Sequence, residues 1–352
     1  MPVPARKVGS LVGPLPIALT MGDPAGIGPD IALASWCSRE TQSLHPFVLY
    51  GSPEIMADRA RRLGLNVPVV PIASLDAAAS IFVDALPVKA VRALAPSTSA
   101  DDIDQLVIAA IKEATEAAAS GEALALVTNP IAKKSLRSIP LAYPGHTAFL
   151  GQLAARFSGG PVPQPVMMLA SDRLKVVPVT VHIPLVKVPE VLTRQLLVDA
   201  IRTTAGALER DFGIGRPRIA VAGLNPHAGE SGLIGTEEAM TIRPAIEELA
   251  REGHTVTGPH SADTMFHDDA RSAYDVAIAM YHDQALIPLK TLSFDSGVNV
   301  TLGLPFVRTS PDHGTAYALA GTGNARPDSL IAALKLATRI GLRRAGSRSH
   351  AT

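Results

Sequence analysis

Cysteine and aromatic residues are scarce in this sequence, and neither sign of charge is in excess. Cys37 is the only cysteine among 352 residues, which excludes an internal disulfide and a centre of several thiolates, and is typical of a reducing compartment. Aromatic residues make up 4%, and Lys plus Arg equal Asp plus Glu at 32 each. Nucleic-acid-binding proteins usually combine a basic excess with stacking aromatics, so no nucleic acid is expected as a partner.

Long apolar runs are also missing. No stretch reaches the roughly 20 apolar residues that a membrane-spanning helix needs. Residues 1–16 lack the continuous apolar segment of a secretory signal, because Pro4 and Pro14 interrupt them. We therefore expect a soluble, cytoplasmic protein without membrane contact.

The residues that are present suffice for a large packed core, with 47% hydrophobic and 18% charged. At 352 residues the chain exceeds the size at which one core stops growing, roughly 250 residues, so two domains are expected. The first should combine residues 1–140 with 291–352, and the second should comprise 141–290. Short apolar runs alternate with helical periodicity, which is typical of an α/β protein with a largely parallel sheet. Strands are predicted at 16–21, 123–127, 174–181, 218–224 and 275–281, and helices at 101–121, 193–213 and 327–344.

A histidine follows three of the predicted strands. His182 follows the strand at 174–181, and His227 and His282 come after the two later ones. Ligands bind outside the carboxyl ends of strands in open α/β sheets. Neutral imidazole is the commonest protein ligand for zinc and related ions, and three protein ligands leave positions for substrate. The sequence therefore favours a catalytic three-histidine metal site, with simple capping of each strand as the alternative.

Polar and cationic residues occur close to these strand ends. Lys290 follows the last strand, Asn299 and Arg308 come shortly after it, and His146 and Thr147 stand in a Pro-Gly turn. Arginine holds a carboxylate or phosphate through two parallel hydrogen bonds, and lysine binds either as a point charge. Taken singly, each of these residues is also compatible with a solvated surface. Taken together, they favour an anionic substrate bound beside a metal.

Two further segments have simpler interpretations. The sequence GDPAGIGPD, residues 22–30, lacks the third glycine of a dinucleotide fingerprint and is interpreted as a tight strand-to-helix turn that brings backbone N–H groups near a ligand. Thr128 and Asn129 are interpreted as the start of a helix, with phosphate contact as the alternative, and Asp283 as a turn residue.

Over nearly its whole length the sequence resembles the 4-hydroxythreonine-4-phosphate dehydrogenases, a family of vitamin B6 biosynthesis. The resemblance rests on the segments TMGDPAGIGPD, YPGHTAFL, GLNPHAGESGLIGTEE, GPHSADTMFHDD, AMYHDQALIPLK and GVNVTLGLPFVRTSPDHGTAYALAG. It implies an isocitrate/isopropylmalate dehydrogenase-like fold, in which two α/β domains enclose an active-site cleft and NAD binds without the usual glycine fingerprint. The domain built from both chain ends would bind the NAD.

The resemblance also implies roles for individual residues. It places one zinc, magnesium or cobalt ion on His182, His227 and His282, in a homodimer whose partner subunit supplies one of these histidines. It implies substrate contacts from His146, Thr147, Lys290, Asn299 and Arg308, and cofactor contacts from Gly314 and Thr315. Ala318 stands where relatives usually carry an acidic residue, so the choice between NAD and NADP stays open.

The implied reaction is oxidation of 4-phosphooxy-L-threonine at C3 by NAD or NADP, followed by decarboxylation to 3-amino-2-oxopropyl phosphate. Lys290 and Asp263 compete as the general base, and Asp263 is also a candidate for orienting an imidazole. A sister dehydrogenase of 4-phospho-D-threonate, D-erythronate or an aromatic cis-dihydrodiol dicarboxylate is the nearest alternative. An acyl-phosphate transferase and a non-catalytic metal- or anion-binding protein are more distant ones.

Overall fold

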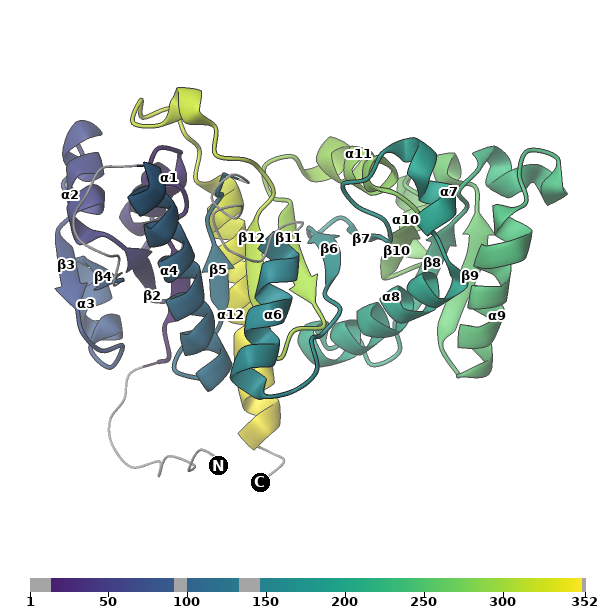
Figure 1. The fold of residues 1–352 in the computed structure, drawn as a ribbon, viewed down its shortest axis with the longest axis horizontal. Helices are drawn as coiled ribbons and strands as arrows, with labels where there is room; N and C mark the ends of the chain where they lie inside the picture. Colours follow the sequence, from purple (N-terminus) through teal and green to yellow (C-terminus); the bar gives the residue numbers. More distant parts are fainter. Residues whose placement is uncertain (1–13, 92–99, 133–145, 350–352) are drawn as a thin grey trace.

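A twelve-stranded sheet runs along the length of the molecule (Figure 1). The computed structural model describes residues 14–91, 100–132 and 146–349. The strand order is β3-β4-β2-β1-β5-β12-β11-β6-β7-β10-β8-β9. The strands are β1 (Ile17–Thr20), β2 (Phe47–Gly51), β3 (Val69–Ile72), β4 (Leu86–Ala90), β5 (Leu126–Thr128), β6 (Val166–Ala170), β7 (Lys175–Pro178), β8 (Arg218–Ala222), β9 (Thr255–His260), β10 (Val276–Ala279), β11 (Val298–Leu302) and β12 (Arg308–Pro311).

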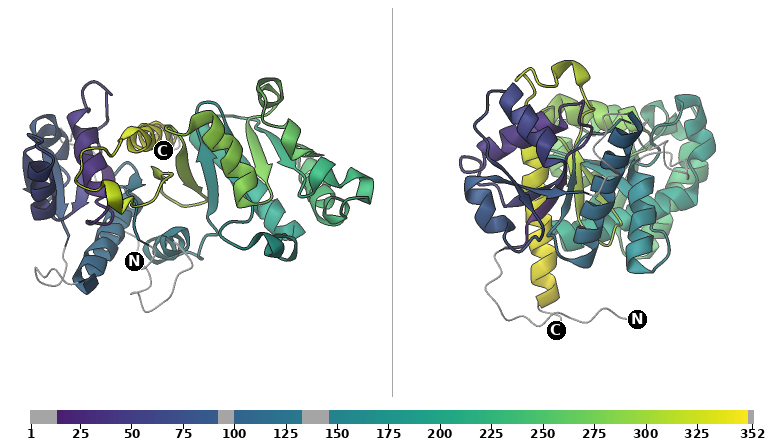
Figure 2. Two further views of the ribbon diagram at one scale, coloured as in Figure 1. Left: turned by 90° about the horizontal axis from the view of Figure 1, so that it is seen from above. Right: turned by 60° about the vertical axis from the view of Figure 1, so that its left-hand side comes forward.

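Helices pack on both faces of this sheet (Figure 2). They are α1 (Gly28–Cys37), α2 (Pro53–Arg62), α3 (Ala78–Asp84), α4 (Ala100–Ser120), α6 (His146–Ser158), α7 (Val188–Val191), α8 (Arg194–Ala207), α9 (Arg243–Arg251), α10 (Asp268–Ser272), α11 (His282–Ser293) and α12 (Asp328–Ser349). None of the described helices is long and apolar enough to span a membrane.

The sheet consists of two parallel regions joined by antiparallel strands. Strands β1 to β5 pair in parallel with one another and with β12, and β7, β10, β8 and β9 form the second parallel region. Between the two regions, β11 is antiparallel to both neighbours, and β6 is antiparallel to β7. The predicted α/β class is confirmed, although the centre of the sheet is mixed. The division into residues 1–140 plus 291–352 and 141–290 stays a prediction.

The strands are buried on both faces because their side chains alternate between two apolar layers. In β1, Ile17 and Leu19 pack with residues of α1 and α12, whereas Ala18 packs with residues of α4 and α6. In β10, Ile278 packs on the side of α8 and α9, whereas Ala277 packs on the side of α11. Figure 2 shows α4 and α6 on the opposite face from α1 and α12. Because helices cover both faces of the sheet, we expect ligands to bind at the ends of the strands.

All five predicted strands and all three predicted helices are present, with shifted ends. The predicted helix 193–213 begins where Thr193 Oγ1 accepts the N–H of Leu196 at 3.1 Å. Its regular part ends at Ala207, and a π-helical turn leads to Gly213, whose φ of +70° ends the helix. The last helix runs beyond the predicted residue 344 to Ser349.

Candidate active site

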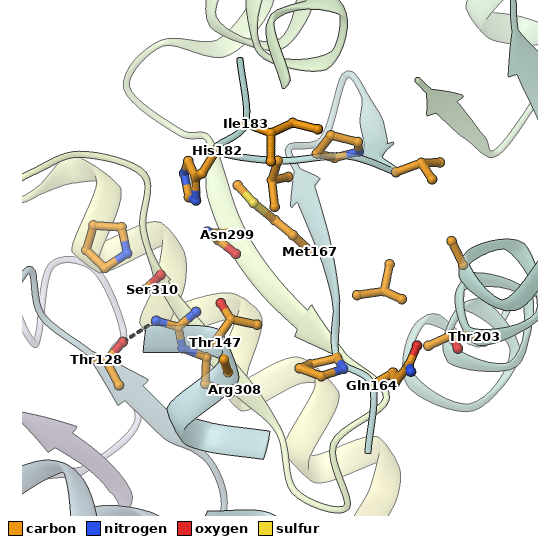
Figure 3. A pocket seen from close by; sticks show the side chains of 18 of the residues that line it. Thr128, Thr147, Gln164, Met167, His182, Ile183, Thr203, Asn299, Arg308 and Ser310 are labelled. Carbon is orange, nitrogen blue, oxygen red and sulfur yellow. Dashed lines mark hydrogen bonds between the residues drawn. The ribbon is translucent and has the colours of Figure 1, made fainter. Parts of the chain in front are cut away.

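A pocket of about 640 Å³ lies across the middle of the sheet, where the two parallel regions meet. Its polar wall comes mainly from β5, β11 and β12 and consists of Thr128, Asn129, Thr147, Asn299, Arg308 and Ser310. The opposite wall is mainly apolar, with Met167 and Ile183 near His182 (Figure 3). Thr128 and Ser310 stand towards the carboxyl ends of β5 and β12, which is where α/β sheets bind ligands. Arg308 is the first residue of β12, and its side chain reaches Thr128 at the end of β5.

Arg308 is the main charged group of the polar wall. Its side chain is 4% exposed, and its Nη2 and Nη1 atoms donate to Thr128 Oγ1 at 2.6 Å and Thr301 Oγ1 at 3.0 Å. No carboxylate of the described chain forms an ion pair with it, and its Nε has no hydrogen-bond partner there. Burial lowers the pKa of Arg308 to about 10, so the group stays cationic at neutral pH. A buried, uncompensated cation facing a pocket is the expected receptor for an anion.

Two asparagines of the same wall also have unused hydrogen-bonding atoms. Asn129 and Asn299 each carry a buried side-chain oxygen for which the described residues provide no partner. Both side chains line the pocket. Buried polar groups without partners are rare in folded proteins and call for a specific explanation. Here, a polar ligand in the pocket would supply the missing partners.

The start of α6 brings Thr147 to this pocket. Thr147 lines it beside Arg308, as Figure 3 shows. Its neighbour His146 begins the helix, but the His146 side chain lies outside the residues that the structure describes. The predicted substrate contact of Thr147 therefore agrees with its position, whereas the contact of His146 stays a prediction.

His182 and His282 come together from two different elements. Their ring centroids are 5.6 Å apart, and the ring planes form an angle of 43°. His182 follows β7 and lines the pocket, and His282 begins α11. The backbone of His182 has a φ of +53°, a left-handed conformation that is unfavourable for any residue other than glycine. Such strain is typical of functional positions.

Asp283 orients the ring of His282. The Nδ1 atom of His282 lies 2.7 Å from Asp283 Oδ1. A carboxylate can only accept a hydrogen bond, so Nδ1 carries the proton and the lone pair is left on Nε2. This is how metal-ligating histidines are usually held. The interpretation of Asp283 as a turn residue is wrong, because Asp283 is the second residue of α11.

His227 does not join this pair within one chain. It begins a left-handed turn after β8, with a φ of +52°. Within residues 14–91, 100–132 and 146–349, no three His, Cys, Asp or Glu side chains are placed to hold one metal ion together. Asp263 is exposed and lies near His227. A hydrogen bond from Ser261 at 2.5 Å lowers the pKa of Asp263, and the charge of His227 lowers it further.

Lys290 lies on α11, eight residues and about two turns after His282. Its Nζ is 3.0 Å from Asp312 Oδ2 and donates to the Asp312 backbone oxygen, also at 3.0 Å. This ion pair joins α11 to the end of β12. Lys290 is thus fixed beside the pocket residues of β12, although it does not itself line the pocket.

The segment that contains Gly314 and Thr315 packs against the glycine-rich turn at 22–30. The N–H of Ile27 donates to the Thr315 oxygen at 2.9 Å. A side chain at Gly26 would place its Cβ 2.8 Å from that same oxygen, so the close contact requires glycine. Gly314 lines the pocket, and a Cβ there would meet nothing within 4 Å. Its backbone is therefore open to a ligand.

Comparisons with known proteins identify the family. The model of the PdxA family, described as pyridoxal phosphate biosynthetic protein, matches residues 42–337. The chain is 51% identical over 334 residues to a 4-hydroxythreonine-4-phosphate dehydrogenase of Xanthobacter autotrophicus, covering 94% of this chain and 95% of the relative. A relative of the same name from Bradyrhizobium diazoefficiens is 52% identical, with 92% and 96% covered.

This chain belongs to the PdxA family.

Solved structures of relatives have the same fold. The 4-hydroxythreonine-4-phosphate dehydrogenase of Klebsiella pneumoniae superposes with a TM-score of 0.78 at 36% identity, covering 93% of this chain and 100% of that chain. A terephthalate 1,2-cis-dihydrodiol dehydrogenase of Burkholderia xenovorans has a TM-score of 0.61 at 27% identity, with 92% and 98% covered. The predictions of a dehydrogenase and of its family are confirmed.

The pocket of this PdxA-family member contains part of the predicted site. It combines Thr147, His182, Asn299, Arg308 and Gly314, whereas the following lie outside its lining: Asp263, His227, His282, Lys290 and Thr315. The predicted roles of all these residues stay predictions. Sequence reasoning interpreted Thr128 and Asn129 as a helix start and missed Ser310, yet all three line the pocket. The position of Thr128 and Asn129 at the end of a buried strand was an available signal. Ser310 had none, because its strand, RTSP, is not apolar.

Proposed function

We propose that this PdxA-family member is an NAD- or NADP-dependent, metal-assisted 4-hydroxythreonine-4-phosphate dehydrogenase. It oxidises 4-phosphooxy-L-threonine at C3, and the resulting β-keto acid loses carbon dioxide to give 3-amino-2-oxopropyl phosphate. The proposed location is the cytoplasm. The observation that carries the proposal is the buried guanidinium of Arg308, which has no ion-pair partner among the described residues, in a pocket that also contains His182.

Arg308 binds one of the substrate's anionic groups. Thr128 and Thr301 hold two of its N–H donors, so the guanidinium cannot turn away from the pocket. The remaining N–H donors of Arg308, together with the side chains of Asn299 and Thr147, provide a polar wall for the substrate. A rigid, partly desolvated cation both attracts the anion and orients the carbon to be oxidised.

The histidines fit a divalent metal ion such as zinc, magnesium or cobalt. His182 and His282 offer two adjacent imidazoles, and Asp283 fixes the tautomer of His282. The third ligand is His227 of the partner subunit, which agrees with the separation of His227 from the other two in one chain. When bound, such an ion is a Lewis acid that stabilises negative charge developing on the substrate oxygen.

Exposed apolar side chains support a homodimer at this site. Leu185 and Val186 follow His182 and are 65% and 76% exposed, and Leu233, on the segment after His227, is 84% exposed. On α11, Ile287 is 64% exposed. Apolar side chains gathered near functional residues are typical of protein interfaces. A second copy of this chain would cover them and bring the partner's His227 to the histidine pair.

Gly314 and Thr315 are proposed to hold the nicotinamide cofactor, which accepts the hydride when bound. Their segment is fixed to the turn at 22–30 by two hydrogen bonds besides that of Thr315: Tyr317 Oη donates to Asp23 at 2.6 Å, and the Gly321 N–H donates to Asp30, also at 2.6 Å. These contacts keep an open backbone surface at Gly314 beside the pocket. The preference for NAD or NADP is measured by comparing kcat/KM with each cofactor.

One observation favours a second candidate, a dehydrogenase of an aromatic cis-dihydrodiol dicarboxylate. The wall opposite Arg308 is largely apolar, with Val166, Met167, Val179 and Ile183 among its side chains. The solved terephthalate dihydrodiol dehydrogenase also has this fold. An apolar wall suits a ring better than it suits a short amino acid. The same polar wall would then bind the carboxylates.

One assay separates these possibilities. The enzyme is incubated with NAD or NADP and either 4-phosphooxy-L-threonine, 4-phospho-D-threonate, 4-phospho-D-erythronate or the aromatic dihydrodiol, and reduced cofactor is followed by absorbance. We expect the highest kcat/KM with 4-phosphooxy-L-threonine. A chelator should abolish the signal, and zinc, cobalt or magnesium should restore it. Full turnover after thorough removal of metal would contradict the metal proposal, and absence of reduced cofactor with every substrate would contradict the dehydrogenase.

A further inference from the structure

The turn that begins with His227 has an unusual backbone. Five residues in succession have positive φ: His227 (+52°), Ala228 (+51°), Gly229 (+77°), Glu230 (+42°) and Ser231 (+58°). Residues other than glycine avoid this region because the Cβ crowds the following carbonyl oxygen. A run that includes four of them persists only when surrounding contacts compensate.

The compensating contacts converge on Glu238. Its side chain is 4% exposed, and its Oε1 accepts the backbone N–H groups of Leu224 and Asn225, both at 2.8 Å. Its Oε2 accepts the side-chain amide of Asn225 at 3.0 Å. No Lys or Arg side chain forms an ion pair with this carboxylate in the part of the chain that the structure describes. Glu238 is therefore a buried carboxyl group whose hydrogen bonds fix the residues that lead into the turn.

Two glycines let the turn pack closely against Glu238. A Cβ at Gly223 would lie 2.8 Å from Ala228 Cα, and a Cβ at Gly229 would lie 2.5 Å from Glu238 Oε2. Gly232, just after the left-handed residues, also has a positive φ of +97°, but a Cβ there would meet nothing within 4 Å. The close packing is thus specific to the side of the turn that contacts Glu238.

We propose that Glu238 is the positioning residue for His227: its carboxylate holds the left-handed turn and so keeps the imidazole ready for the metal site of the partner subunit. This inference rests on the proposed three-histidine metal site. Fixing His227 in advance removes the cost of ordering a ligand on binding, which raises metal affinity. Glu238 itself does not contact the substrate or the metal.

The test measures zinc affinity directly, by equilibrium dialysis of the demetallated dimer, without substrate or cofactor. Glu238→Gln places an amide where the carboxylate accepts backbone N–H groups, and we expect roughly tenfold to hundredfold weaker zinc binding. With saturating zinc, kcat should largely recover. Glu237 cannot be the control, because its Oε2 also accepts the Asn225 amide, at 2.8 Å. Glu247→Gln is the matched control, since it makes the same change in charge at an exposed position of α9, and its zinc affinity should equal that of the wild type.

A second pair of variants keeps the test decisive if Glu238→Gln does not fold. Gly229→Ala and Gly232→Ala both add a methyl group at positive φ, but only the first meets Glu238. We expect weaker zinc binding from Gly229→Ala alone. The role of Glu238 would be overturned if each of the two test variants, Glu238→Gln and Gly229→Ala, bound zinc as tightly as its control while His227→Ala bound zinc more weakly. Unchanged zinc affinity in His227→Ala would instead overturn the metal site on which this inference rests.

Discussion

The rings of His182 and His282 lie 5.6 Å apart, centroid to centroid, although one hundred residues separate them in the chain. The parallel pairing of β7 with β10 accounts for this, because His182 follows the first strand and His282 follows the second. His227 follows β8, the other neighbour of β10, yet it begins a left-handed turn and does not join the pair. Two ligands of the proposed metal site are thus assembled by the sheet itself, and the third requires a second subunit.

Arg308→Lys should weaken substrate binding more than it affects the chemical step. A lysine keeps the charge but cannot bond Thr128 and Thr301 while also presenting two donors to an anion. The loss of one charge-assisted hydrogen bond, about 1.5–3 kcal/mol, lowers kcat/KM by about tenfold to hundredfold, mainly through KM. Steady-state kinetics measure this, with the surface variant Arg251→Lys as the control. Unchanged kinetics would remove Arg308 from the substrate site.

Lys290→Met should lower kcat/KM at least about hundredfold, because it removes either a proton acceptor or an anion contact beside the end of β12, where Lys290 pairs with Asp312. A loss confined to kcat, with one limb of the pH profile gone, assigns Lys290 as the base, and a loss in KM assigns it as a substrate contact. Lys335→Met is the control, since Lys335 bonds Gln42 at the surface. Wild-type kinetics of Lys290→Met would exclude both roles.

Asp263→Asn should leave kcat nearly unchanged when metal is saturating. The hydrogen bond from Ser261 lowers the pKa of Asp263, so its carboxylate is a weak proton acceptor near neutral pH. Its proximity to His227 suits an orienting role instead, and we expect weaker zinc binding from the variant. Titrating the activity with zinc measures both kcat at saturating zinc and the affinity for zinc. A hundredfold fall in kcat at saturating zinc would assign the base to Asp263.

Asp211→Asn should destabilise the fold without touching the pocket. Burial alone would raise the pKa of Asp211, but hydrogen bonds from Arg344 and Arg210 outweigh it and hold the pKa below its usual 3.8. The unfolded-state pKa is therefore the higher one, so the stabilisation is complete above about pH 4 and is lost as the pH falls through the folded-state pKa. Breaking this buried contact should cost about 3–5 kcal/mol near neutral pH.

Denaturant unfolding at several pH values checks the role of Asp211. The exposed pair of Lys187 and Glu190 provides the control, because Glu190→Gln should change the free energy of unfolding by about 0–1 kcal/mol. Equal stability of Asp211→Asn and the wild type at neutral pH would show that the buried ion pair contributes nothing.

The sequence predicts the fold where apolar periodicity is strong and fails where it is weak. The runs that form β1, β5, β7, β8 and β10 are recognisable as buried strands. Strand β12 is not, because Arg308–Pro311 reads RTSP, and its burial comes from α12 and the neighbouring strands rather than from its own composition. Tertiary contacts of this kind leave no local signal.

The same limit applies to the site. Arg308, Asn299 and Thr147 were predicted, and all three line the pocket. The separation of His227 from the other histidines could not be read from the sequence, because all three come after strands in the same way. The role proposed for Glu238 could not be read from the sequence either, because it depends on a contact beside a turn with left-handed backbone. Conformation and contacts beyond neighbouring residues decide both features.

Mixed dimers test the shared metal site most directly. His182→Ala and His227→Ala are each expected to form inactive homodimers. In a mixed dimer, one site would lack both His182 and His227. The other site would keep His182 and His282 of one subunit together with His227 of its partner. A one-to-one mixture after subunit exchange should therefore recover about a quarter of wild-type activity, since half of the dimers are mixed and each has one intact site.

The matched control is a mixture of His182→Ala with His282→Ala, in which every site lacks one histidine because both positions belong to the same chain's pair. We expect activity in the first mixture and none in the second. Absence of activity in the first mixture, with mixed dimers shown to have formed, would contradict a metal site shared between subunits.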